Sequence, residues 1–328
     1  MKRFSAFYLF KIAVTAGLVW LLFSRVDFGG FIAVFSGISI DYFLLAVLAL
    51  TVGWWLNTLR WKTLLGIFKM RLKTWRLFLY NLISIFYNLV LPGGKVMGDV
   101  VRGYQVARDH DGEPVEKHRL FLITFIDRGL GLLGLLILTS FYFIFGHEAI
   151  TYLGSSAQIV GVAAIIISAS GLIVVFSSIF DWIFIPLRKI PLRFTQKIFT
   201  TITDSLEICR SGRKQLAGSL VITMLAAIAA GLSVAFLAIG LGIDMRFLNI
   251  LFFNTLAVVL IVIPITIAGI GLRESGLVYL FVAAGIMPES ALALSILNLL
   301  VMVVLALMGG LIEFYNHFLK DGFSHQKS

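Results

Sequence analysis

The chain has 328 residues, of which 59% are hydrophobic and 13% are charged, and its mean hydropathy is +0.99. These values lie far outside the range of soluble globular proteins and exclude that class. Uncharged runs divide the sequence, and most approach or exceed the ~20 residues that a helix needs to cross a hydrocarbon core. The runs are Ile12–Ser24, Tyr42–Leu59, Leu77–Gly94, Gly129–Gly146, Ala149–Phe180, Gln215–Ile243, Phe247–Leu272 and Ser290–Ile312. The sequence therefore predicts an all-α polytopic membrane protein.

The net charge of +10 raises the question of nucleic-acid binding, and its distribution argues against it. Basic residues gather near the N-terminus, in the eleven lysines and arginines of 60–119, and in the seven of 188–214. The other short connections carry mainly acidic residues, so the positive-inside rule places the three basic clusters in the cytoplasm. We expect the cytoplasmic (inner) membrane, with the N-terminus and the short tail 317–328 inside. No nucleic-acid partner is expected, because no folded basic domain is present.

The sequence lacks the motifs that indicate signal-peptide cleavage, disulfides, metal binding, nucleotide binding or catalysis. The first run ends without a small-x-small cleavage site, so we expect an uncleaved first helix instead of a signal peptide. Cys209 is the only cysteine, which excludes an internal disulfide and a cysteine metal cluster. The sequence contains no GxxxxGK[ST] loop, no HExxH pair and no serine or cysteine nucleophile with its base. We expect no cofactor, no metal and no enzymatic centre.

The third run contains helix breakers that do not suit a complete crossing. If it crossed fully, every later segment would invert and the basic residues of 188–214 would lie outside. We therefore expect Leu77–Val90 to enter from the cytoplasm, break at Pro92, Gly93 and Gly94, and return through Gly98–Ala107 as a re-entrant hairpin. Irregular backbone at membrane depth is tolerated where protein buries it or water reaches it. The new helix is expected to begin near Gly98, with its free amides facing an anionic group.

The seventh run repeats this pattern and predicts an inverted repeat. It contains Pro264, Gly269 and Gly271, and the next apolar piece, Ser275–Pro288, has too few residues for a crossing. We expect 248–286 to form a second hairpin, entered from outside. The fold is then one membrane domain, 1–328, with about six transmembrane helices and two re-entrant hairpins. Its halves, 1–148 and 149–316, have opposite orientation, as in secondary transporters whose substrate site lies between the repeats.

Three motifs in this order resemble one protein family. They are Leu91-Pro92-Gly93-Gly94 with Gly98-Asp99 and Arg102, the pair Asp127-Arg128, and the stretch from Gly269 to Glu274. Together they resemble the membrane region of lysylphosphatidylglycerol synthases, whose stand-alone relatives are called flippase-like proteins. The resemblance covers essentially the whole chain and implies a role in moving or handling lipids. The full-length synthases add a soluble aminoacyl-transferase domain, which does not follow in this sequence, so we expect no aminoacylation by this chain alone. Asp127 stands where many relatives would have Glu.

Charged residues within apolar runs are the candidate headgroup or phosphate ligands. Asp99 and Arg102 are three residues apart and can share a helix face. Intramembrane charges are costly unless paired, and they mark functional paths. We expect a four-charge cluster that joins the halves. Its members are Asp127, Arg128, Arg273 and Glu274. The alternatives are a local ion pair at the surface for Asp99 and Arg102, and a bracing network for the cluster.

Uncharged polar residues give a second set of candidates. Asn81 and Asn88 share a face of the first hairpin helix, and Ser295 and Asn298 share a face of the last helix. They are expected to line a polar groove for a headgroup, or else to form interhelical hydrogen bonds. The tryptophans are expected to anchor the chain at the membrane interface. These tryptophans are Trp54, Trp55, Trp61 and Trp75.

The sequence thus predicts a lipid translocase or lipid-handling protein. Its substrate is expected to be an anionic or aminoacylated phospholipid, or a polyprenyl-phosphate lipid. The alternative is a non-transporting membrane partner that presents lipid to a separate glycosyltransferase or aminoacyl-lipid transferase. Membrane lipids are the expected partners in both cases. The sequence is compatible with a homo-oligomer and does not fix the lipid, the direction or the energy source.

The predicted topology can be tested by labelling. Single cysteines at Lys95, Lys117 and Lys197, in a Cys209→Ser background, should resist impermeant thiol reagents applied outside, because both basic segments are expected to be cytoplasmic. Labelling is measured on intact cells and, as a positive control, after permeabilisation. External labelling at position 117 would contradict the first hairpin and the inverted repeat.

Overall fold

The computed structural model describes residues 28–91, 95–109, 117–145, 154–176, 212–260 and 271–316. Every regular element in these ranges is a helix, and four of the helices are long and apolar enough to cross a membrane: α3, α6, α11 and α14. The helices are α2 (Phe28–Ser36), α3 (Ile40–Ile67), α4 (Thr74–Val90), α5 (Lys95–Asp109), α6 (Lys117–Phe145), α8 (Ser155–Phe176), α11 (Arg213–Gly240), α12 (Phe247–Leu260), α13 (Leu272–Ala283) and α14 (Pro288–Phe314). The all-α polytopic prediction is confirmed, and the chain is a multi-pass membrane protein.

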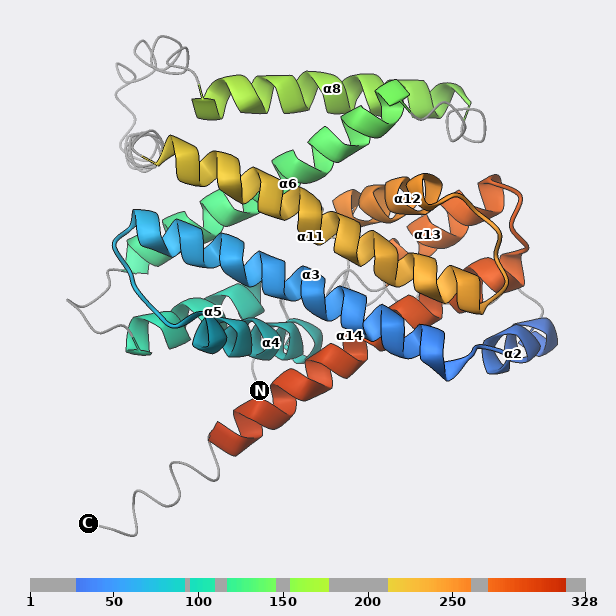
Figure 1. Ribbon diagram of the computed structural model, residues 1–328, viewed down its shortest axis with the longest axis horizontal. Helices are drawn as coiled ribbons and strands as arrows, with labels where there is room; N and C mark the ends of the chain where they lie inside the picture. Colours follow the sequence, from blue (N-terminus) through green and yellow to red (C-terminus); the bar gives the residue numbers. More distant parts are fainter. Residues whose placement is uncertain are drawn as a thin grey trace, which may run out of the picture.

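The long helices α3 and α11 form the central pair, side by side and running in opposite directions (Figure 1). Small residues let them approach closely. A Cβ added to Gly53 would lie 3.2 Å from the carbonyl oxygen of Ala226. At one end of the pair a Cβ on Gly240 would lie 2.9 Å from Tyr42, and at the other a Cβ on Gly212 would lie 2.9 Å from a methyl of Ile67. Small residues at such contacts are typical of helix packing in membranes.

Two helical hairpins flank this pair. Helices α4 and α5 pack against each other at one end of the structure, and α12 and α13 pack against each other at the other end (Figure 1). The four helices have 17, 15, 14 and 12 residues. At ~1.5 Å per residue none is longer than about 26 Å, which is less than the ~30 Å of a hydrocarbon core. Pro92–Gly94, Pro264 and Gly269, the predicted breaks, lie outside the described residues.

Gly98 is not a hairpin break, in contrast to the expectation from the sequence, because α5 already begins at Lys95. It lies inside α5 where this helix touches α4. A Cβ there would overlap the side chain of Asn88 and the carbonyl oxygen of Ser84. The amide of Gly98 donates to Asn88 Oδ1 at 3.1 Å. Glycine is therefore required at position 98 for close packing.

The first hairpin is also held by a polar contact at the end of α5. The hydroxyl of Tyr80 donates to Asp109, and Arg108 Nε donates to the other oxygen of this carboxylate at 2.9 Å. Burial favours the neutral acid, but these hydrogen bonds and the charges of Arg108 and Arg76 hold the pKa of Asp109 below its ordinary value. The ion pair to Arg76 is long, at 3.8 Å, and the Arg76 side chain is 57% exposed. It therefore adds little to stability.

The last long helix of each half packs on the hairpin of the other half. Helix α14 contacts α4, where Gly309 lies directly against the backbone at Leu82. Helix α6 contacts α12, where the Tyr142 ring stacks on Phe252 with centroids 4.1 Å apart. The Tyr142 hydroxyl donates to Asn249 Oδ1 at 2.5 Å. The hairpins are therefore fixed by residues distant in the sequence.

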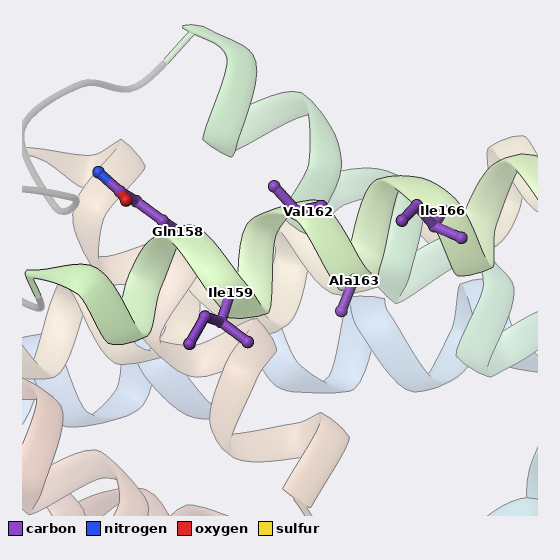
Figure 2. A pocket seen from close by; sticks show the side chains of 5 residues that line it. All are labelled: Gln158, Ile159, Val162, Ala163 and Ile166. Carbon is purple, nitrogen blue, oxygen red and sulfur yellow. The ribbon is translucent and has the colours of Figure 1, made fainter.

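The outer faces of the helices are apolar. Large side chains such as Ile159 on α8 and Leu311 on α14 are about seven-tenths exposed, which suits contact with lipid in a chain of this composition. An apolar groove follows the outer face of α8 (Figure 2). Its lining residues are Gln158, Ile159, Val162, Ala163 and Ile166.

Gly309→Ala should destabilise the protein, because the new methyl group would overlap the carbonyl oxygen of Leu82. Overpacking of this kind typically costs about 1–3 kcal/mol. The matched control is Gly218→Ala in α11, where nothing lies within 4 Å of an added Cβ. This change should leave stability unchanged or raise it, because alanine is the better helix former. Thermal unfolding in detergent measures both, and equal midpoints for the two variants would contradict the close α4–α14 contact.

Candidate functional site

Asp127 is the centre of a buried polar network. It lies on α6, about 12 Å along the helix from Arg119, and is only 4% exposed. Arg60 Nε, on α3, donates to Asp127 Oδ1 at 2.9 Å. Arg102 Nη2, on α5, donates to Asp127 Oδ2 at 3.3 Å. One carboxylate therefore links three helices, and each of its oxygens accepts from a different guanidinium.

Arg102 connects the first hairpin to α3 and is itself buried. Its Nη1 donates to Asn81 Oδ1 at 2.9 Å, and the Asn81 amide donates to Thr58 Oγ1 at 2.7 Å. The guanidinium lies over the Trp61 ring, 4.0 Å from its centroid, which is a cation–π contact. Within α5, Asp99 Oδ1 lies 3.3 Å from Arg102 Nη2, as the spacing of three residues predicts.

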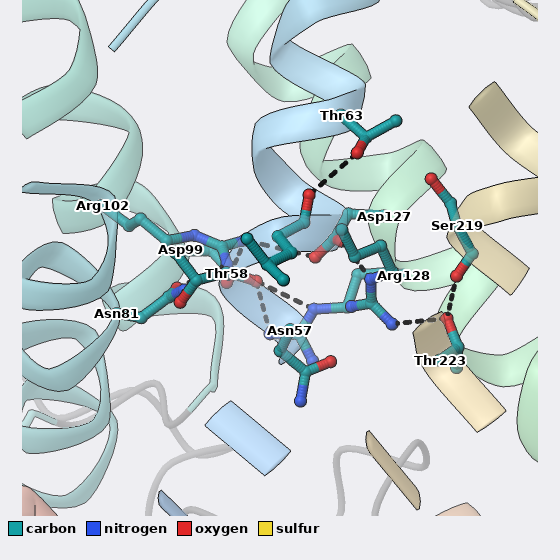
Figure 3. Close-up of polar contacts among 12 residues, drawn as sticks. Asn57, Thr58, Thr63, Asn81, Asp99, Arg102, Asp127, Arg128, Ser219 and Thr223 are labelled. Carbon is teal, nitrogen blue, oxygen red and sulfur yellow. Dashed lines mark hydrogen bonds and ion pairs between the residues drawn. The ribbon is translucent and has the colours of Figure 1, made fainter. Parts of the chain in front are cut away.

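Arg128 extends the network toward the surface. Its Nε donates to Asp99 Oδ2 at 2.9 Å, and its side chain is 44% exposed. Neighbouring residues on a helix point about 100° apart, and Asp127 and Arg128 accordingly have different partners. We call Arg60, Asp99, Arg102, Asp127 and Arg128 the arginine–aspartate network. Figure 3 shows Asp99, Arg102, Asp127 and Arg128 turned toward one another.

The inner end of the network reaches α11. Arg60 Nη1 donates to Thr223 Oγ1 at 3.1 Å. Thr223 Oγ1 in turn donates to the carbonyl oxygen of Ser219 at 2.8 Å (Figure 3). A Cβ on Gly131 of α6 would lie 3.4 Å from the same guanidinium nitrogen. The charged residues of the first half of the chain are therefore in polar contact with the second half.

The arginine–aspartate network has more donors than acceptors. Among the described residues, the three guanidinium groups of the network are linked to two carboxylates. Arg102 Nε and Trp61 Nε1 are buried and have no hydrogen-bond partner among the described residues. Both atoms can only donate, and a buried donor without an acceptor costs about 1–3 kcal/mol. The arrangement is chemically suited to an anionic oxygen.

A second charged pair lies on α13, at the other hairpin. Arg273 Nη2 donates to Glu274 Oε1 at 2.7 Å, and both residues are buried. The amide of Gly271 donates to Glu274 Oε2 at 2.7 Å. Gly271 has φ of +83°, a conformation that favours glycine. Arg273 also contacts the sulfur of Met302 on α14. Glu274 thus neutralises Arg273 and also caps the N-terminus of α13.

The four-charge cluster expected from the sequence is replaced by two separate groups. Among the described residues, no hydrogen bond or ion pair joins Asp127 to Arg273. Arg60 already supplies the buried positive charge that Asp127 requires, and Glu274 supplies the negative charge that Arg273 requires. Asp127 and Arg273 are therefore each paired without a contact between the two groups.

The other polar residues predicted to line a cavity make contacts within the protein. Asn88 accepts from the Gly98 amide, as described above. Ser295 Oγ on α14 donates to the carbonyl oxygen of Glu274 at 3.4 Å, and Asn298 is 5% exposed. Interhelical hydrogen bonding, the alternative interpretation, accounts for Asn88 and Ser295.

Sequence reasoning missed Arg60, Trp61 and Thr223. The uncharged run Tyr42–Leu59 stops before Arg60, which the charge pattern assigns to the cytoplasmic basic residues, but α3 continues to Ile67 and buries Arg60. Trp61 was expected to anchor the chain at the interface, but it is 1% exposed beneath Arg102. The signal available in the sequence was the apolar pattern after the charge, since Leu64 and Leu65 continue the helix and are buried.

The fold and the buried charges define the class: a multi-pass α-helical membrane protein with a polar site between its helices. Within that class, residues 8–310 match the family described as lysylphosphatidylglycerol synthase TM region. The chain belongs to this family, as its motifs predicted, and it is a lipid-related membrane protein. No curated protein matches the sequence closely enough to count as a relative.

Double substitutions can test whether the two charged groups are separate. Asp127→Asn and Arg273→Gln each leave a buried charge without its partner, which typically costs about 3–5 kcal/mol. Because the two residues share no partner, their effects should add within about 0.5 kcal/mol. Arg60→Gln with Asp127→Asn should cost clearly less than the sum, since these residues share a bond. Denaturant titration in detergent measures the free energies, and coupling between Asp127 and Arg273 above about 1 kcal/mol would restore the single cluster.

Proposed function

We propose that the protein binds the phosphate of a lipid headgroup at the arginine–aspartate network and moves the lipid between leaflets. The observation that carries the proposal is the excess of buried donors, with Arg102 Nε and Trp61 Nε1 unpartnered among the described residues. Membership of a lipid-related membrane family supports the same ligand. The lipid tails would remain in the bilayer, against the apolar outer faces of the helices.

The chemistry of guanidinium groups supports phosphate as the ligand. Arginine presents a planar fork of donors that matches phosphate oxygens, and it stays charged at all relevant pH values. The oxygens of a phosphodiester could accept from the buried donors Arg102 Nε and Trp61 Nε1. Asp99 is the carboxylate that a phosphate would displace most easily, because Arg128, one of its partners, is half-exposed.

Corresponding positions in the two halves support an inverted repeat. Helices α3 and α11 both have 28 residues, and they touch at Gly53 and Ala226, the fourteenth residue of each. Asn81 and Asn254 are both buried and are the eighth residues of α4 and α12. The contact of α14 with α4 has its counterpart in the contact of α6 with α12. An axis of pseudo-symmetry would pass through the Gly53–Ala226 contact.

The two halves of the proposed repeat differ in the charge of their buried residues at corresponding positions. Arg60 and Asp127 are the twenty-first residue of α3 and the eleventh of α6. The same positions of α11 and α14 hold Ser233 and Asn298, which are buried and uncharged. The network would therefore form in one half only, beside the interface of the repeats where secondary transporters bind substrate. We place this site in the cytoplasmic membrane, with both hairpins re-entrant.

A vesicle assay tests the proposal. The protein is reconstituted with a phospholipid that carries a fluorophore on its acyl chain, and a membrane-impermeant quencher reports movement between leaflets. Native mass spectrometry counts the lipids that remain bound. Arg102→Gln should lower both readouts by about tenfold, because a charge-assisted bond is lost. The matched control is Arg76→Gln, at an exposed arginine of the same hairpin, which should leave both unchanged.

The outcomes separate the alternatives. If Arg102→Gln folds and still binds and moves lipid like the unaltered protein, the network is not the site. If the unaltered protein binds phospholipid through Arg102 but moves none, it presents lipid to a separate transferase.

A further inference from the structure

A second polar group lies one helical turn along α5 from Arg102. Its members are Tyr87 on α4, Gln105 on α5 and Glu313 near the end of α14. The Tyr87 hydroxyl donates to Glu313 Oε1 at 3.1 Å. Gln105 Nε2 lies 3.5 Å from Glu313 Oε2, at the limit of a hydrogen bond. Three helices thus bring a carboxylate, an amide and a phenol together.

This group has the opposite imbalance to the arginine–aspartate network: it lacks donors. Gln105 is 5% exposed, and its Oε1 is buried without a hydrogen-bond partner among the described residues. No described lysine or arginine forms an ion pair with Glu313. A carboxylate offers about four lone-pair positions, and the two neutral donors here fill only part of them. Leaving the buried Gln105 Oε1 without a donor is costly, and Glu313 beside it is only partly buried.

We propose that Glu313, Gln105 and Tyr87 form a cation subsite. The ligand is a small cation that supplies what the group lacks: either an ammonium group, with three N–H donors, or an alkali ion, which takes oxygen ligands. An ammonium would pair with the Glu313 carboxylate and donate to Gln105 Oε1. The Tyr87 hydroxyl would keep the carboxylate in place.

The position of Gln105 relates the two subsites. Arg102 and Gln105 are three residues apart on α5, so their Cβ atoms are about 5–6 Å apart on one face. A phosphate at Arg102 and a cation at Glu313 would then be neighbours, as they are in a headgroup that contains both a phosphate and an amine. This relation rests on the proposed function, whereas a free alkali ion at Glu313 does not.

Lipid selection tests the subsite. The purified protein is equilibrated with equal amounts of phosphatidylethanolamine, which carries phosphate and amine, and phosphatidylglycerol, which carries phosphate alone. Native mass spectrometry then gives the ratio of the two bound lipids. Glu313→Gln should lower the amine-lipid ratio by about tenfold, and Gln105→Met should lower it in the same direction. Glu289→Gln, in the first turn of the same helix, is the matched control and should leave the ratio unchanged.

A salt titration tests whether the cation is an alkali ion instead of the ammonium group of a lipid. If the ligand is an alkali ion, sodium chloride should raise the thermal midpoint above that in equal choline chloride, and Glu313→Gln should abolish the difference. If Glu313→Gln and Gln105→Met change neither the lipid ratio nor the sodium effect, the proposal is wrong. It is also wrong if Lys320→Gln, seven residues after Glu313, reproduces both losses, because the cation would then belong to the chain itself.

The lipid-selection and salt experiments on Glu313 and Gln105 are independent of the Arg102 experiment. Arg102→Gln lowers the binding of both lipids if the phosphate proposal holds, whereas Glu313→Gln changes only the choice between them. A failure of one result therefore does not imply a failure of the other.

Discussion

The arrangement of the first half depends on one shared carboxylate. Asp127 lies within an apolar helix, where an unpaired charge costs about 2.5–3.5 kcal/mol or more, and Arg60 and Arg102 carry the matching charges from two other elements. Each of these three buried charges would be costly without its partners. The positions of α3, α5 and α6 therefore depend on one another. The helices of the α4–α5 hairpin are too short to cross the membrane and require support from neighbouring helices. Its bond through Arg102 to α6, and through Asn81 to α3, supplies a directional contact that apolar packing in lipid does not.

The sequence was informative about elements and less so about their partners. Hydropathy found the long described helices, because uncharged apolar runs long enough to cross a membrane are typical of transmembrane helices and rare in soluble chains. It did not find α2, which lies between two of the predicted runs. Proline and glycine positions indicated the two hairpins, whose helices do pack in pairs. Helix ends were harder: Arg60 ended an apolar run and was placed at the surface, yet the helix continues for seven more residues to Ile67. A charge ends a helix at the membrane surface only if it has no partner inside, and the partner here, Asp127, is 67 residues away.

The grouping of charges was beyond the reach of sequence for the same reason. Asp127 and Arg273 were equally good candidates for one cluster, since each stood in an apolar run beside a helix break. Whether these charges form one cluster or two depends on which opposite charge lies nearest to each of them in the folded structure. The sequence does not contain that distance. Glu274 is adjacent to Arg273 in the sequence and is its partner in space, whereas Asp127 is adjacent to Arg128 and is paired elsewhere. The group at Glu313 had no sequence signal, because Tyr87, Gln105 and Glu313 come from three distant segments.

The contact between α3 and α11 has a consequence for kinetics. Gly53 meets Ala226 at its middle, where no large side chain separates the two helices, and a glycine faces Tyr42 at one end and Ile67 at the other. Helices that interlock through large side chains must withdraw each side chain from its gap before they can turn, whereas the small residues at the middle of this contact present little such resistance. If the halves reorient about this contact as proposed, the polar contacts that cross it add to the activation barrier. Arg60 and Thr223 form such a contact. The rate of reorientation would then respond to the occupancy of the charged site.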